Sequence, residues 1–243
     1  MFKNTYFFRT AGLIILLSSV SNLFAASFNV KPTRIFVQTL PQSSLSVKNQ
    51  GDTEVIIQAE LIKWTQARGV DVYAPARDVI ISPPFFKIPP GETQIVRVHS
   101  LLTDVVNQER TYRVILQELP SPSPDTKKTG VATILRMSVP IFILPNTVDE
   151  PHLAWKTTRT EKGLLIRAKN TSNSHIQLTS LKLVDDEGRV LFSRKIFAYI
   201  LAGQSYFWSI KLDEIWQSNQ LKISVDSDRD KLFAKARHES RFN

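Results

Sequence analysis

The stretch 131–144 reads VATILRMSVPIFIL and decides how the first half of the chain is organised. Its odd positions before residue 139 are apolar except Thr133, and its last third is apolar on both parities. A strand this long and apolar normally lies in the centre of a sheet, but Pro140 has no N–H to donate and favours an edge or a bulge. An exposed apolar edge is either a liability or a binding site. A buried central strand with a proline bulge is the alternative.

Short alternating segments on both sides of this stretch predict an all-β chain. Apolar residues share one parity at 55–61, 164–168, 206–212 and 221–225, and no long stretch has helical spacing. Such spacing is typical of antiparallel immunoglobulin-like sandwiches. The polar segment between Pro145 and Pro151 can neither continue a strand nor easily begin a helix. The sequence therefore predicts two domains, 27–146 and 147–243.

The first 26 residues have the pattern of a secretory signal. Lys3 and Arg9 flank aromatic residues before an apolar run from Ala11 to Val20, and Ala25 and Ala26 end the segment. A transmembrane anchor is the competing interpretation, but the run is about half the ~20 residues that a bilayer core requires. We therefore expect cleavage after this segment and no membrane insertion of the mature chain. An exported chain without cysteine needs no oxidation to fold, which fits a periplasmic location.

The composition excludes several classes of site. The chain has no cysteine and 8 glycines, none of them two positions from another, which excludes thiol chemistry, cysteine metal sites, GxGxxG turns and P-loops. The 4 histidines lack tight ligand spacing, and no GxSxG motif appears. His175 is expected to make a hydrogen bond within a turn or strand. We predict no enzyme, no cofactor and no metal site.

The basic character of the chain raises the question of a polyanion partner. The formal net charge is +9, but the lysines and arginines are dispersed and no aromatic residues interleave with them as a stacking platform. We therefore expect no nucleic-acid partner. The basic tail 228–243 is expected to be a frayed, solvated terminus.

Several segments, in order and spacing, resemble the periplasmic pilus chaperones of the PapD type. They are FNVKPTRIFV at 28–37, IISPPFFKIPPGETQIVRV at 80–98, ERTYRVILQELP at 109–120 and the long strand that ends in VPIFILP at 139–145. NTSNSHIQLTSLKL at 170–183 and LAGQSYFWSI at 201–210 agree more weakly. The absence of cysteine, with YRVILQELP and RMSVPIFI, favours the archaic, spore-coat-protein-U-like branch of the family.

The resemblance implies both an architecture and a function. The architecture is two immunoglobulin-like β-sandwiches set at an angle, like a boomerang, with a cleft between them. The function is to bind, fold and cap pilin subunits and to deliver them to an outer-membrane usher. In this family the subunit lacks its last strand and the chaperone lends one. The family register places the donor residues at Val131, Thr133 and Leu135, with Met137 as an extension.

The resemblance also implies an anchor for the terminal carboxylate of the subunit. Arg34 in KPTRIFV matches the arginine of the family. The lysine position of the family falls on Pro140, so a second cation is missing where it is expected. Arg136 is the nearest substitute on the same parity of the strand.

A charged network between the domains is a further feature of the family. Glu109 and Asp226 fit its two acidic positions, but Leu144 occupies its arginine position. Apolar packing is therefore expected to fix the angle between the domains.

A secreted two-domain adhesin or structural pilus component is the alternative function. Such a protein is expected to carry an N-terminal donor extension and usually a single immunoglobulin-like domain. The mature chain instead reaches its first strand motif almost at once, which favours the chaperone. Self-association of the free protein, the identity of its subunit and the role of the tail stay open at this point.

Overall fold

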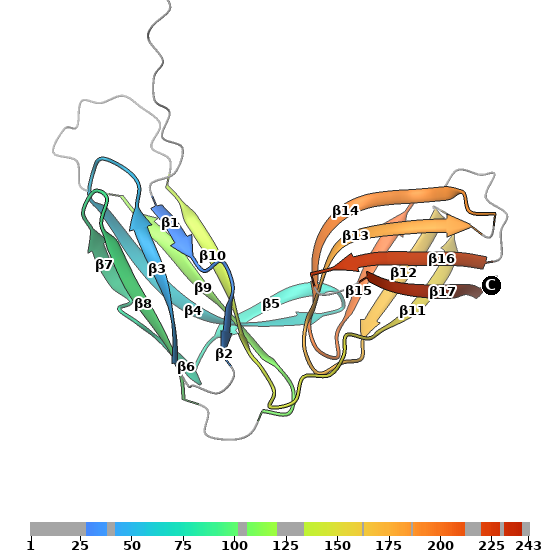
Figure 1. The fold of residues 1–243 in the computed structure, drawn as a ribbon, viewed down its shortest axis with the longest axis horizontal. Helices are drawn as coiled ribbons and strands as arrows, with labels where there is room; N and C mark the ends of the chain where they lie inside the picture. Colours follow the sequence, from blue (N-terminus) through green and yellow to red (C-terminus); the bar gives the residue numbers. More distant parts are fainter. Residues whose placement is uncertain are drawn as a thin grey trace, which may run out of the picture.

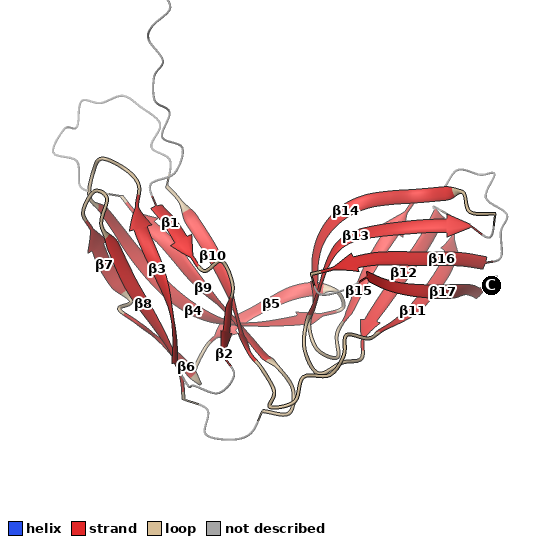
Figure 2. Ribbon diagram, viewed as in Figure 1, coloured by secondary structure: helices blue, strands red, loops and turns tan. Residues whose placement is uncertain are grey.

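The computed structural model describes residues 28–37, 42–101, 106–120, 134–161, 163–185, 187–211, 220–228 and 231–239. Every helix or strand assigned in these residues is a strand, as Figure 2 shows. None of the described residues forms a helix long and apolar enough to span a bilayer. The predicted signal segment lies outside the described residues.

The first domain packs two sheets face to face. The smaller sheet has the order β1-β3-β8-β6, made of β1 (Phe28–Lys31), β3 (Gln42–Asn49), β8 (Thr93–Ser100) and β6 (Val79–Ser82). The larger has the order β2-β10-β9-β4-β5, with β7 also paired to β4; its strands are β2 (Ile35–Val37), β10 (Arg136–Ile143), β9 (Arg110–Leu119), β4 (Val55–Ala67), β5 (Val70–Pro75) and β7 (Phe85–Ile88).

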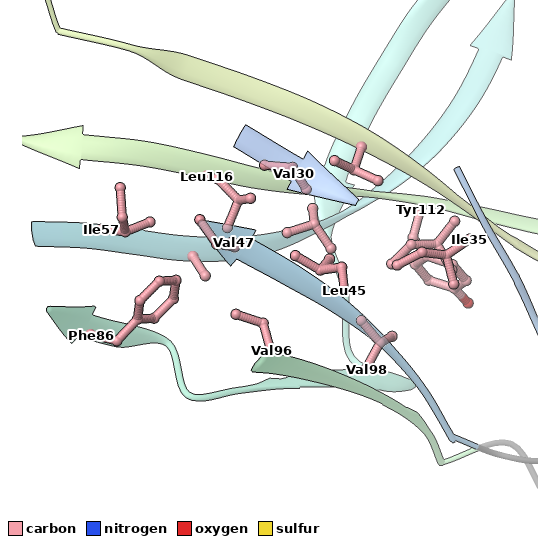
Figure 3. Packing of buried hydrophobic residues seen from close by; sticks show 14 of the residues in the cluster. Val30, Ile35, Leu45, Val47, Ile57, Phe86, Val96, Val98, Tyr112 and Leu116 are labelled. Atoms are coloured by element: carbon pink, nitrogen blue, oxygen red, sulfur yellow. The ribbon is translucent and has the colours of Figure 1, made fainter. Parts of the chain in front are cut away.

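Alternation along these strands builds the core of the first domain. Alternate residues of β3, β4, β8 and β9 point between the sheets, so Val47, Ile57, Val96 and Leu116 are fully buried there (Figure 3). The alternating segments found in the sequence therefore have a direct physical cause, since these strands have one face in the core and one outside.

The second domain is formed by one sheet that folds over its own core. Its order is β14-β13-β16-β17-β11-β12-β15, made of β14 (Val190–Ile200), β13 (Ile176–Asp185), β16 (Gln220–Ser227), β17 (Lys231–Glu239), β11 (Leu153–Thr160), β12 (Gly163–Asn170) and β15 (Ser205–Ile210). Leu164, Ile166, Leu183 and Val225 are fully buried between its two halves.

The C-terminal segment corrects one prediction. Residues 231–239, expected to be part of a frayed tail, form β17, which pairs antiparallel with β16 and parallel with β11. This strand therefore connects the two halves of the second domain.

The two domains lie at an angle to one another (Figure 1). The predicted all-β chain with two sandwich domains is thereby confirmed. The hairpin of β4 and β5 extends from the first domain toward the second, because β4 is 13 residues long and continues beyond its pairing with β9. This arm contributes to the junction described below.

Candidate functional site

The first half of β10 has a neighbour on one flank only. β9 pairs with all of β10, from Arg136 to Ile143. On the other flank, β2 pairs only with the end of the strand, Ile141 to Ile143. Within the described part of the chain, residues 136–140 therefore form an open sheet edge.

The backbone register identifies which groups face this edge. The N–H of Glu118 on β9 donates to the C=O of Leu135 at 2.9 Å. Because antiparallel pairing alternates with a period of two, the odd residues of β10 face β9 and the even ones face the open flank. The N–H of Leu144 follows this parity, since it donates to Val37 at the end of β2 at 2.9 Å.

Pro140 belongs to the even set, so its missing N–H removes nothing from the β9 ladder. The edge interpretation of the proline is therefore correct for residues 136–140. The alternative of a buried central strand applies only to the last three residues of β10, which have strands on both sides.

The side chains of this edge separate by face. Leu135 and Met137 are half-buried against the core of the first domain, and Val139 is 2% exposed. Ile134 and Arg136 lie on the opposite parity and are exposed. The other two expected donors, Val131 and Thr133, lie outside the described residues.

Arg34 reaches from the first domain to the second. It lies in the loop between β1 and β2, and its Nη1 donates to Oδ2 of Asp228 at 2.6 Å and to Oε1 of Gln177 at 2.8 Å. Burial alone would lower the pKa of Arg34, but the hydrogen bond and charge of Asp228 outweigh it and raise that pKa. The guanidinium is therefore firmly charged at the junction between the domains.

A buried carboxylate–imidazole pair lies deeper in the same junction. Glu109 precedes β9, and its carboxylate lies 2.8 Å from Nδ1 of His175, which precedes β13. Both side chains are almost fully buried. The structure thus places Glu109 at the junction, and the expectation that His175 bonds within its own turn or strand is wrong.

Asp226 requires a correction. Its Oδ2 accepts from Ser180 at 2.7 Å, which lies on the neighbouring strand of its own domain. The acid that reaches the first domain is Asp228, two residues further along. The sequence pattern identified the correct strand but the wrong acid. Asp226 lies within the pairing of β16 with β13, whereas Asp228 follows the end of β16 and contacts Arg34.

Apolar packing accompanies these polar contacts, as expected from Leu144. Trp64, Phe142 and Leu201 form a buried cluster, with Leu144 and Tyr199 packed against it. This cluster joins the outer face of the larger sheet of the first domain to β14 of the second.

A comparison of the sequence with known families shows to which family the chain belongs. Residues 27–149 match the family described as pili and flagellar-assembly chaperones, PapD N-terminal domain. The chain belongs to this chaperone family.

The relatives of the chaperone are distant in sequence. A curated relative, the uncharacterized fimbrial chaperone YhcA of Escherichia coli K12, is 24% identical over 139 residues. The aligned region is 57% of this chain and 58% of the relative, so the chain spans a little over half the length of that curated protein.

Solved chaperone structures share the whole fold. CsuC, from a complex of CsuC with the tip adhesion subunit CsuE of the archaic Csu pili of Acinetobacter baumannii, matches with a TM-score of 0.66 and 21% identity, over 88% of this chain and 100% of that one. The Salmonella enterica complex of the SafA pilin with the SafB chaperone gives 0.60 and 14% identity, over 86% and 95%.

Pro140, which occupies the lysine position of the family, lies opposite an arginine on the neighbouring strand. Pro140 pairs in register with Arg113 on β9, so both lie on the outer face at the same level of the sheet. The Arg113 guanidinium lies 3.8 Å above the Trp64 ring, and its Nη1 donates to Ser138 at 3.2 Å. Arg136, the expected substitute, lies opposite Gln117, further from the junction.

The Tyr199 phenol lies near both Arg34 and Arg113. Burial raises the pKa of the Tyr199 phenol, and the positive charges of Arg34 and Arg113 oppose that rise. A cavity of about 450 Å³ opens beside it, lined by residues of both domains that include Trp64, Arg113, Tyr199 and Phe197. Sequence reasoning missed Arg113, although aligning ERTYRVILQELP antiparallel to RMSVPIFI would have placed it opposite Pro140.

Proposed function

We propose that this protein is a periplasmic chaperone that captures pilin subunits by donating the edge of β10 and passes them to an outer-membrane usher. The observation that carries the proposal is the open flank of residues 136–140, in a chain that belongs to the pilus chaperone family. The protein acts by binding, without catalysis. The structural likeness to the archaic chaperone CsuC agrees with an archaic usher pathway.

The open edge has the properties that an incomplete sandwich needs. A subunit lacking its last strand has unpaired backbone groups and an exposed core. The even residues of β10 would pair with those backbone groups, while Leu135 and Met137 would extend into the subunit core together with Val131 and Thr133. Burying each large apolar side chain is worth roughly 1.5–3 kcal/mol before ordering costs.

The junction supplies the anchor for the subunit's terminal carboxylate. Arg34 would bind it from the first domain, because a guanidinium fork matches a carboxylate in shape and charge. Arg113 is a better candidate for the second cation than Arg136. It pairs in register with Pro140, and like Arg34 it lies close to Tyr199. Arg136 is the competing assignment.

Co-purification tests the donor strand. Tagged protein is purified from the periplasm of cells that assemble the pilus, and the companions are identified by mass spectrometry. We expect a pilin subunit with the wild type and none with Leu135→Asp. Ile134→Asp is the matched control, because Ile134 is 47% exposed and of the opposite parity.

The folding of both variants is checked by thermal unfolding. Equal recovery of the subunit with Leu135→Asp and with the wild type overturns the proposal. If Leu135→Asp does not fold, Met137→Asp replaces it, because Met137 is also only half-buried.

A further inference from the structure

The contacts of Arg34 are unusual for a residue that would receive a ligand. A single nitrogen, Nη1, donates to both Asp228 and Gln177, at 2.6 and 2.8 Å. An Nη carries two N–H groups, so this pair of acceptors uses both. The hydroxyl of Tyr199 is a further hydrogen-bond partner of the guanidinium, and among the described residues Asp228 is the acid that pairs with Arg34. Because Asp228 and Gln177 are both held by Nη1, the edge formed by Nε and Nη2 carries neither of them, and this is the edge along which a guanidinium binds a carboxylate side-on.

The two acceptors belong to one corner of the second domain. The backbone N–H of Asp228 donates to the C=O of Gln177 at 3.0 Å, which ties the end of β16 to the start of β13. Gln177 in turn pairs in register with Tyr199 on β14. Asp228 and Gln177 therefore hold Arg34 from a fixed platform.

The first domain fixes the guanidinium from the other side. The centre of the group lies 6.0 Å from the ring centroid of Phe36, whose ring stacks on Phe142 in the junction. The Arg34 side chain remains 35% exposed, so a ligand can reach it, whereas Asp228 is 15% exposed. An arginine that is already oriented loses less conformational freedom when it binds a carboxylate.

We propose that Asp228 and Gln177 are positioning residues, which orient the Arg34 guanidinium so that its Nε and Nη2 receive the terminal carboxylate of a subunit. This inference rests on the proposed function. The anchor is then complete only while the two domains are docked, because the arginine comes from one domain and its supports from the other. By linkage, a bound carboxylate stabilises the docked arrangement.

The test uses a synthetic peptide that covers the final strand of the subunit recovered with the wild-type protein. The peptide is made with a free C-terminal carboxylate and as a C-terminal amide, and both affinities are measured by calorimetry. We expect the wild type to prefer the carboxylate by about tenfold or more. Arg34→Gln should remove that preference.

Asp228→Asn is the decisive variant, and Asp226→Asn is its matched control. Both acids lie near the end of β16, but the side chain of Asp226 accepts a hydrogen bond from Ser180 of its own domain. We expect Asp228→Asn to reduce the preference for the carboxylate to about twofold and Asp226→Asn to leave it unchanged. Gln177→Leu removes the second acceptor and should act in the same direction, which keeps the test possible if Asp228→Asn does not fold.

Each outcome decides the inference. A merely structural role of Asp228 would weaken both peptides equally, and a role as competitor for Arg34 would strengthen binding of the carboxylate form; either result overturns it. Leu135→Asp separates this failure from failure of the proposed function. If that variant binds both peptides as well as the wild type, donor-strand capture itself is wrong, whatever Asp228 does.

Discussion

The carboxylate of Glu109 and the imidazole of His175 meet inside the junction, with Oε2 2.8 Å from Nδ1 and both side chains at most 1% exposed. The backbone N–H of His175 also donates to Oε1 of Glu109 at 3.2 Å. Because a carboxylate accepts hydrogen bonds, the His175 tautomer with its proton on Nδ1 satisfies this contact. The ring then stacks on Phe142 at 3.7 Å between centroids. One acid thus fixes both the position and the orientation of a histidine from the other domain.

Removing this acid should loosen the docking of the domains. Glu109→Ala leaves an imidazole N–H and a backbone N–H buried without an acceptor, and we expect a loss of about 3 kcal/mol in the free energy of unfolding. Chemical denaturation measures it, and Glu60→Ala, at an exposed position of β4, is the control. A loss of less than about 1 kcal/mol, the range of surface pairs, would contradict this account.

Gln66 makes a further polar connection between the domains. Its Oε1 accepts from the N–H of Leu201 at 3.0 Å, and its Nε2 donates to the C=O of Tyr199 at 2.8 Å. The amide therefore pairs with the backbone of the second domain as a neighbouring strand would. At 7% exposure, it does so away from water.

Gln66→Leu keeps the volume of the side chain but leaves those backbone groups unpaired. We expect a loss of about 2 kcal/mol in stability and a larger radius of gyration by small-angle X-ray scattering, because the β4–β5 arm no longer holds the second domain. Gln117→Leu, at an exposed position of β9, serves for comparison. An unchanged scattering curve for Gln66→Leu would show that Gln66 does not set the angle between the domains.

The lowered pKa of Asp78 predicts how the stability of the first domain depends on pH. Burial alone would raise the pKa of Asp78, but hydrogen bonds from the Tyr112 hydroxyl at 2.7 Å and from Arg110 at 3.2 Å outweigh it and hold that pKa below its ordinary value. A carboxyl with a lower pKa in the folded state stabilises the fold above its unfolded pKa of about 3.9. That contribution is lost as the pH falls through the folded value.

Asp78→Asn should therefore be less stable than the wild type at neutral pH, by about 1 kcal/mol for a partly exposed carboxylate. The difference should shrink as the pH falls below about 4. Urea unfolding over a series of pH values measures both curves. If the stabilities of the wild type and of Asp78→Asn change in parallel down to the lowest pH measured, the lowered pKa of Asp78 has no role in stability.

The sequence allowed much of the fold to be predicted, because alternation reports which face of a strand is buried. It also predicted that Arg34 and Glu109 lie at the junction and that an edge opens near Pro140, where the structure has them. What it missed depends on pairing between distant segments. Arg113 faces Pro140 only through the register of β9 with β10, and His175 meets Glu109 only when the two domains dock.

The last strand was missed for a related reason. KLFAKARHE at 231–239 is basic and close to the C-terminus, which is typical of a solvated tail. Its backbone nevertheless lies between β16 and β11, where two otherwise open strand edges need a partner. Tertiary pairing, rather than local composition, decides the structure of this segment.

Truncation tests the importance of β17. Removal of residues 231–243 should abolish cooperative unfolding of the second domain, because β16 and β11 each lose a neighbour. Removal of 240–243 alone, beyond the end of β17, should leave the transition in place. Differential scanning calorimetry resolves the two cases. Unchanged melting after the longer truncation would mean that the sheet closes without β17.

Proline substitutions on β10 test which backbone groups the protein uses for its partner. Ser138 is of the same parity as Pro140, so its N–H faces the open flank and not β9. We expect Ser138→Pro to fold with a change in stability of about 1 kcal/mol or less, yet to bind a pilin subunit at least about tenfold more weakly, because a donor to the subunit strand is lost.

Val139→Pro, one residue further, removes an N–H that faces β9 and should destabilise the first domain by about 3 kcal/mol. Ser138→Ala removes only the hydroxyl that accepts from Arg113 and should bind as the wild type does. If Ser138→Pro captures the subunit normally, the edge is held through side chains alone and the backbone pairing inferred from the register is wrong.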